Sequence, residues 1–364
     1  MSYQKKINFN NNENISFINI NNAISENDFT KLKKYGSQGY GFINNNLRKK
    51  IWEILICPED KKLESKIDWK LLPVHKDENQ VQLDVDRSFI HYPKNLSYLD
   101  IKKKRNELNS LIVEILRKHP YLNYFQGYHD IAQVFLLCIG RKKAARPLEF
   151  LSLTRIRDFF LPSLSPVLDH LEFIKLIVQK KDHELGKHIA NVPSHFALAS
   201  YLTWFSHEIK HLKHIFEIFD FILSTDTAMV LYIYAAIIIQ KKSEIMIIDK
   251  GETDILHKFL NNLSQECHSK DIFRKSISLR EEISLCSLSN WKYIMKYSFL
   301  NDSEERYNLE YASKLYYMEI NELKKLKSQQ YIFTKNILNK TILIATVALL
   351  SISIAYLKKI IKSM

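Results

Sequence analysis

Apolar residues recur at intervals of three and four along most of this chain, and this spacing constrains its fold more than any other feature. Such a spacing places apolar side chains on one face of an α-helix. Glycine occurs only 7 times and proline 8 times in 364 residues, too rarely for the many tight turns of an all-β fold. We therefore predict an all-α protein. With 46% hydrophobic residues, the chain can bury one large core or two modest ones.

The clearest helices can be placed from their apolar spacing and from the residues that end them. The first covers LRKKIWEIL (47–55), the second lies between Ser97 and Pro120, and the third ends at Gly140, where glycine suits a C-terminal cap. Residues 252–300 are less clearly periodic. Further helices are predicted at 147–160, 166–180, 193–214, 215–224 and 226–241.

The two ends of the chain differ from the middle in composition. Residues 1–27 are rich in asparagine and aperiodic, so we expect them to be disordered. Residues 28–300 carry the periodic helices and are predicted to form the main domain. Residues 301–340 are highly charged and are predicted to form a helical linker.

The C-terminal stretch TILIATVALLSISIAYL (341–357) contains seventeen residues without a charge, between Lys340 and Lys358. As a helix it would span about 25 Å, slightly short of a hydrocarbon core, and lysines at both ends can reach the headgroups. We predict a transmembrane tail anchor that leaves residues 358–364 as a short basic lumenal tail. The large domain would then remain in the cytosol.

The net charge of +13 is compatible with nucleic acid or with an anionic membrane surface. The excess is mostly lysine, in a chain that is also rich in asparagine and isoleucine, which is the bias of an AT-rich genome. No RNP, zinc-finger or basic-zipper pattern accompanies it. We expect solvated lysine faces and no nucleic-acid partner. The glycine cluster YGSQGYG (35–41) matches no phosphate-binding motif, so we expect no nucleotide bound by the chain itself.

Three short segments carry polar residues at suggestive spacings: RKKIW (48–52), VQLDVDR (81–87) and YFQG (124–127). Each has an ordinary structural explanation. Residues 48 and 52 lie one helical turn apart, where arginine commonly stacks on tryptophan. Residues 84 and 87 have the spacing of a surface ion pair. The glutamine and glycine of the third segment could simply begin a helix.

Taken together and in this order, the three segments resemble the fingerprint of the TBC-domain Rab GTPase-activating proteins, R-x-x-x-W, I-x-x-D-x-x-R and Y-x-Q-G. Val81 replaces the isoleucine, and Tyr128 stands where many members have methionine. The resemblance continues through RIRDFF (155–160), FALASYLTWFSHEI (196–209) and EIFDFIL (217–223), and covers roughly residues 40–245. The run YFQGYHD and the C-terminal anchor are similar to the membrane-anchored branch of the family, which acts in the early secretory pathway.

This resemblance implies a mechanism in which the chain supplies two side chains to a Rab-type GTPase. The partner carries the GTP and Mg²⁺, so the chain needs no cofactor and has no independent enzymatic activity. Arg87 matches the arginine that stabilises charge on the transferring phosphoryl group, and Gln126 matches the glutamine that positions the attacking water.

The remaining motif residues have supporting roles in this resemblance. Asp84 is expected to orient Arg87. Tyr124 is expected to pack the loop that contains Gly127 and presents Gln126. Arg48 and Trp52 are expected to belong to the scaffold.

One further motif suggests a different chemistry. His207, Glu208 and His211 form an H-E-x-x-H sequence, which on a helix could bind Zn²⁺ with Glu208 as general base. The surrounding apolar residues predict a helix on which these histidines, and His214, point to solvent. The core-facing stripe of that helix would consist of Leu202, Phe205, Ile209, Leu212 and Phe216. We therefore expect surface histidines.

Two other classes of function stay open from the sequence. One is a catalytically silent TBC domain that binds a Rab as an effector or a tether, against which the intact Arg87 and Gln126 argue. The other is the zinc peptidase. For location, the resemblance favours the membrane of the endoplasmic reticulum or early Golgi. The mitochondrial outer membrane is the alternative, because a short span with basic flanks also suits it.

Overall fold

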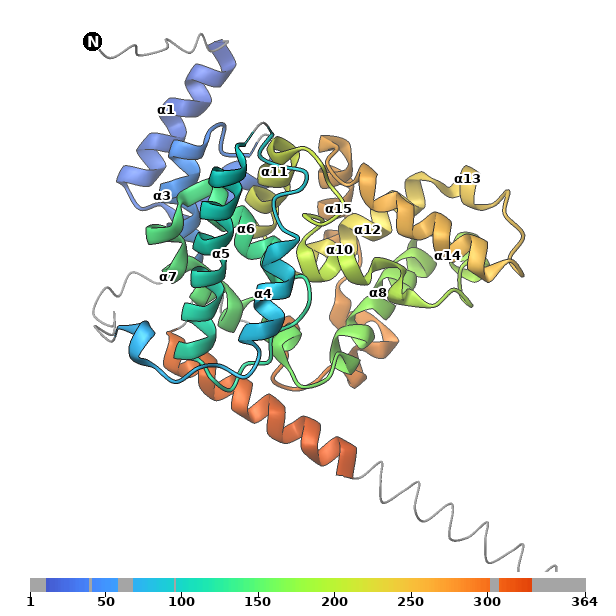
Figure 1. Cartoon of the computed structure of the whole chain (residues 1–364). Helices are drawn as coiled ribbons and strands as arrows, with labels where there is room; N and C mark the ends of the chain where they lie inside the picture. The colour runs from blue at the N-terminus through green and yellow to red at the C-terminus, as the bar shows by residue number, and fades with distance from the viewer. Residues whose placement is uncertain (1–10, 39–40, 58–67, 95, 302–307, 329–364) are drawn as a thin grey trace, which may run out of the picture. The chain divides into compact units, whose positions relative to one another are not determined.

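The computed structural model describes residues 11–38, 41–57, 68–94, 96–301 and 308–328, and every regular element in these ranges is helical (Figure 1). The predicted all-α fold is therefore confirmed. Among these residues, no helix combines the length and the apolarity that crossing a membrane would need. The predicted span (341–357), its basic tail (358–364) and part of the predicted linker lie outside the described residues.

The chain divides into two compact units, Met1–Tyr316 and Tyr317–Met364. Residues 309–316 at the end of the first unit are helical, as are residues 317–328 in the second. The α-helices of the first unit are α1 (Asn11–Ser25), α2 (Phe29–Ser37), α3 (Asn45–Ile56), α4 (Glu78–Asp86), α5 (Tyr98–Lys118), α6 (Tyr128–Ile139), α7 (Arg141–Thr154), α8 (Ser165–Lys181), α9 (His183–His188), α10 (Leu198–Thr203), α11 (Leu212–Ser224), α12 (Met229–Gln240), α13 (Lys242–Ile245), α14 (Thr253–Asn262) and α15 (Lys270–Glu282).

Two largely buried helices, of which α12 is almost entirely apolar, form the centres of the core. In α12 the ten residues from Met229 to Ile238 are all buried, and the helix packs against α8 and α15. In α6 most residues are also buried, and this helix packs against α3, α5 and α7. A helix that is apolar on all sides must be surrounded by protein, and Figure 1 shows other helices around both.

A buried carboxylate joins α11 to α3. Asp220, which is fully buried, accepts hydrogen bonds from Arg48 Nε at 2.9 Å, from Trp52 Nε1 at 2.7 Å and from the backbone N–H of Phe42 at 2.8 Å. The Arg48 guanidinium lies over the ring of Phe216 and not over Trp52. Arg48 and Trp52 thus lie in the core, held through a shared acceptor that the spacing alone did not indicate.

The N-terminal prediction needs correction. Residues 1–27 were expected to be largely disordered. Residues 1–10 lie outside the described residues, whereas Asn11–Ser25 form α1, which packs against α2 and α3. Ile20 and Ala23 are buried, and Phe17 is half-buried one turn earlier. This sparse apolar stripe provides enough contact with neighbouring helices to order an asparagine-rich segment, since helices in proteins are stabilised mainly by packing.

The predicted helix at 193–214 is also wrong, because the chain turns in its middle. A short 3-10 segment (Ser194–Ala197) is followed by α10, which ends at Thr203. Trp204 and Phe205 then adopt left-handed backbone conformations with φ of 48° and 62°. The Phe205 N–H returns to the Ser200 carbonyl at 2.9 Å, as at many helix C-termini. Both rings are fully buried, and their packing compensates for a left-handed backbone that costs about 1–2 kcal/mol per residue.

Most other predicted helices correspond to observed ones. The segments 166–180, 215–224 and 226–241 fall on α8, α11 and α12. The segment 147–160 is divided, because α7 ends at Thr154 and a 3-10 turn follows at Arg157–Phe160. In that turn the buried Arg157 donates from Nε to the Tyr297 carbonyl at 3.0 Å, which ties residues 289–299 to the core.

Candidate functional site

Three separate segments meet around one surface pocket of about 530 Å³. The end of α4 contributes Arg87, the loop before α6 contributes Gln126 and Gly127, and the turn after α10 contributes His207. The residues of the second and third predicted motifs therefore lie at the same place on the surface.

Arg87 directly follows the last residue of α4, and its side chain is 51% exposed. Its Nη2 donates to Asp84 Oδ1 at 2.6 Å, whereas the Asp84 side chain is only 1% exposed. This is therefore not an ordinary surface ion pair, because one partner is fixed in the protein interior. Within the described part of the chain, the Arg87 side chain makes no other hydrogen bond, so the rest of its guanidinium is available to a ligand.

Asp84 is held by several donors besides Arg87. Its Oδ2 accepts a hydrogen bond from the Tyr124 hydroxyl at 2.8 Å and lies 3.4 Å from His129 Nδ1. Burial disfavours the charged carboxylate, but the interactions with His129, Tyr124 and Arg87 outweigh it and lower the pKa of Asp84 below its ordinary value. Asp84 is thus a fixed anion that holds the arginine in place.

Tyr124 links this carboxylate to the glutamine loop. Its backbone N–H donates to Asp77 Oδ2 at 2.9 Å, and its ring packs against Tyr128. Burial and the neighbouring Asp84 raise the pKa of the Tyr124 hydroxyl, which keeps it protonated as a donor. Tyr124 therefore connects the start of α6 to both ends of α4.

Gln126 is exposed at the pocket and makes no hydrogen bond within the described residues. Gly127 follows with φ of +113°, a conformation that side chains rarely adopt. A Cβ at this position would lie 3.0 Å from Thr203 Cγ2, so the close approach of α10 also favours glycine. The loop that carries the exposed Gln126 therefore turns at a position that favours glycine.

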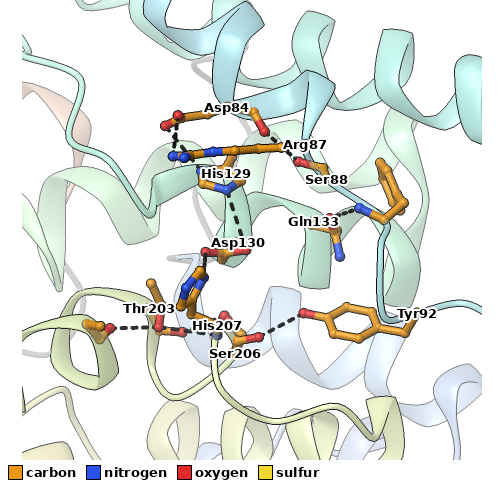
Figure 2. Close-up of polar contacts among 12 residues, drawn as sticks. Asp84, Arg87, Ser88, Tyr92, His129, Asp130, Gln133, Thr203, Ser206 and His207 are labelled. Carbon is orange, nitrogen blue, oxygen red and sulfur yellow. Dashed lines mark hydrogen bonds and ion pairs between the residues drawn. The ribbon is translucent and has the colours of Figure 1, made fainter. Parts of the chain in front are cut away.

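A chain of polar contacts continues from Asp84 to the other side of the pocket (Figure 2). The buried His129 lies between two carboxylates, with Nδ1 3.4 Å from Asp84 Oδ2 and Nε2 3.6 Å from Asp130 Oδ1. Asp130 Oδ2 in turn lies 3.1 Å from Nδ1 of His207. None of these three residues was assigned to this pocket from the sequence, where His207 was considered only as part of the H-E-x-x-H motif. The available signal was the pair His129–Asp130, placed directly after the glutamine motif.

The H-E-x-x-H residues do not have the arrangement of a zinc peptidase. His207 lies in a turn and His211 immediately precedes α11, so the two do not share a helical face. Glu208 is largely enclosed, accepts a hydrogen bond from Ser200 Oγ at 3.0 Å, and has a pKa raised by burial. In the ranges that the structure describes, no three His, Cys, Asp or Glu side chains are grouped to hold a metal ion.

The fold and the pocket define an all-helical domain that presents an arginine and a glutamine in one surface pocket. The family description "Rab-GTPase-TBC domain" matches residues 45–246, more than half of the chain. The chain therefore belongs to the Rab-GTPase-TBC domain family.

Individual relatives agree with this assignment. The chain is 28% identical over 359 residues to "GTPase-activating protein gyp10" of Schizosaccharomyces pombe, covering 94% of this chain and 95% of that protein. It is 29% identical over 241 residues to human "TBC1 domain family member 20", covering 66% of this chain but only 60% of the relative. The crystal structure of the Chlamydomonas flagellar RabGAP TBC domain superposes with a TM-score of 0.57 at 15% identity, covering 73% and 90%, which shows a common fold.

Proposed function

We propose that this protein stimulates GTP hydrolysis by a Rab-type GTPase, and that Arg87 and Gln126 act directly on the bound nucleotide. The observation that carries the proposal is that both side chains are exposed in one pocket, although they come from different elements. The family membership and the printed names of the relatives, which include "GTPase-activating protein", support the same reaction.

Arg87 suits the first requirement of this reaction. Hydrolysis spreads negative charge over the transferring phosphoryl oxygens and the leaving oxygen. A guanidinium is always protonated and offers a planar fork that can reach two oxygens together. Asp84 orders this fork before the partner binds, so less conformational entropy is lost in the complex.

Gln126 suits the second requirement, a positioned water. A carboxamide can accept a hydrogen bond from the water and donate another to a phosphate oxygen. In our proposal Tyr124 and Gly127 hold the loop that presents Gln126, while Arg48 and Trp52 stabilise the scaffold through Asp220. GTP and Mg²⁺ arrive with the partner GTPase.

Supply of the glutamine by this protein has a direct consequence for the partner. A Rab whose own catalytic glutamine is replaced by alanine should still be stimulated substantially, because Gln126 positions the water in its place. The measurement is single-turnover release of phosphate from a panel of GTP-loaded Rabs, each with and without its glutamine. A responsive Rab that becomes wholly insensitive without its glutamine would contradict the role of Gln126. A Rab that binds but is never stimulated would instead indicate a silent effector or tether.

The proposal extends to membrane anchoring through residues 341–357, which the uncharged sequence and its flanking lysines support. The endoplasmic reticulum or early Golgi is the proposed location, and the mitochondrial outer membrane the alternative. In this arrangement the catalytic domain faces the cytosol and residues 358–364 reach the lumen.

Deletion of residues 336–364 should release a soluble protein that retains its stimulation of GTP hydrolysis in solution. Its activity in cells should fall, because anchoring confines both partners to one surface and raises their effective concentration. N-terminal fluorescent fusions with and without this segment report the location, and a hydrolysis assay reports the activity. Membrane residence of the truncated protein, or a lumenal N-terminus in a protease-protection assay, would contradict the topology.

A further inference from the structure

The charged groups of the pocket are arranged with cations outward and carboxylates inward. The side chains of Arg87 and His207 are 51% and 62% exposed. The carboxylates that they contact, Asp84 and Asp130, are 1% and 13% exposed. Both anions are thus covered by protein, and the surface offered to a ligand is cationic whenever His207 is protonated.

His207 is held in a defined position. Asp130 lies 3.1 Å from its Nδ1, which leaves Nε2 as the nitrogen available to a ligand (Figure 2). The preceding turn is also anchored, since the Tyr92 hydroxyl donates to the Ser206 carbonyl at 3.0 Å. Phe205, just before it, is fully buried. An ordered imidazole loses little conformational entropy when it binds a partner.

The surroundings of His207 favour its charged form. The hydrogen bond with Asp130 raises the pKa of His207 above its ordinary value, and the nearby Glu208 acts in the same direction. Partial burial and the positive charge of Arg87 oppose this shift. Among the described residues, other titratable groups also face Asp130: His129 lies on its other side, and the hydroxyls of Tyr92 and Tyr124 interact with it.

We propose that His207 is a second ligand-binding cation of this pocket, which pairs through Nε2 with an anionic group of the GTP-bound GTPase. The inference rests on the proposed function and adds a residue to the same site. The anionic group is either a carboxylate of the GTPase or a phosphate of its nucleotide. We expect the carboxylate, because Arg87 and Gln126 already serve the phosphate. His207 then contributes to recognition of the partner.

The test compares the wild-type protein with His207→Gln and His207→Lys in stimulated GTP hydrolysis. His183→Gln, at an exposed histidine of α9 outside the pocket, is the matched control. The same GTPase is used at every pH. Dividing the kcat/KM of the wild type by that of the variant therefore cancels the titration of the partner. Thermal melting of each variant confirms that it is folded.

At about pH 6 we expect His207→Gln to lower kcat/KM about threefold to fivefold, mainly by raising KM. The cationic contribution is complete below the ordinary histidine pKa and is lost as the pH rises through the raised value. The ratio of the wild-type kcat/KM to that of His207→Gln should therefore approach one at about pH 9. His207→Lys should remain active at both extremes, and His183→Gln should match the wild type.

The division between KM and kcat identifies the anion. An effect on KM indicates an anion contacted already in the ground-state complex, as expected for a carboxylate of the GTPase, whereas an effect confined to kcat indicates a phosphate contacted only in the transition state. A ratio of one at about pH 6, or a loss of the same size at every pH, overturns the inference. If the inference about His207 fails while the wild type is active and Arg87→Lys is inactive, the proposed function still stands. A wild type that stimulates no Rab overturns both.

Discussion

Replacing Arg87 with lysine is expected to reduce the stimulated rate of GTP hydrolysis by about a thousandfold. Lysine keeps the positive charge and can still pair with Asp84, but it lacks the planar fork that reaches two phosphoryl oxygens together. Single-turnover phosphate release at saturating protein measures the loss. The substituted side chain is half exposed, so the fold should survive, as thermal melting would verify.

Gln126→Ala tests whether the two side chains act as a unit. We expect damage of similar size, and the double variant should be scarcely worse than either single one, since residues that serve one transition state are strongly non-additive. Lys210→Gln, at an exposed cation of the adjacent cleft, serves as a control and should keep most of the stimulation. Near-normal stimulation by Arg87→Lys or by Gln126→Ala would exclude the direct roles proposed for them.

Replacing Asp220 with alanine is expected to lower the free energy of unfolding by about 3–5 kcal/mol. Burial raises the pKa of Asp220 in spite of the opposing charge of Arg48, so the carboxylate itself is costly to bury. The expected loss of stability comes from the groups that donate hydrogen bonds to Asp220. Arg48 Nε, Trp52 Nε1 and the Phe42 N–H would all lose their acceptor in the core.

The matched control is Asp271→Ala on α15. Asp271 also accepts from an arginine, Arg274 at 3.0 Å, but both side chains are largely exposed, and such pairs contribute about 1 kcal/mol or less. Urea unfolding of residues 1–335 carrying each substitution gives the comparison. If Asp220→Ala cost as little as Asp271→Ala, the buried carboxylate would not be the link between α11 and α3 that its geometry indicates.

The helices were largely predictable because their signal is local. Apolar spacing over ten or more residues reports which face a helix buries, and α5 and α8 follow it. The prediction failed at Trp204 and Phe205, where no glycine or asparagine marks the left-handed turn. There the burial of two large rings by distant helices overrides the local preference. The same kind of long-range packing orders α1.

The candidate site divides in a similar way. Arg87, Asp84, Tyr124, Gln126 and Gly127 were identified from the sequence, because their spacing within two short motifs resembles a known fingerprint. That spacing says nothing about their distance from one another in space. The meeting of Arg87, Gln126 and Gly127 in one pocket depends on how α4 packs near the start of α6.

The sequence by itself determined the helical class, the positions of most helices and the residue types available for the chemistry. Only the tertiary structure decided which partners those residues have. His207 was interpreted as a surface histidine on a continuous helix, whereas the buried turn before it places it beside Asp130 at the pocket. Asp220 lay unremarked in an apolar run, yet it accepts three hydrogen bonds in the core. Both outcomes depend on contacts between residues far apart in the chain, which local periodicity does not encode.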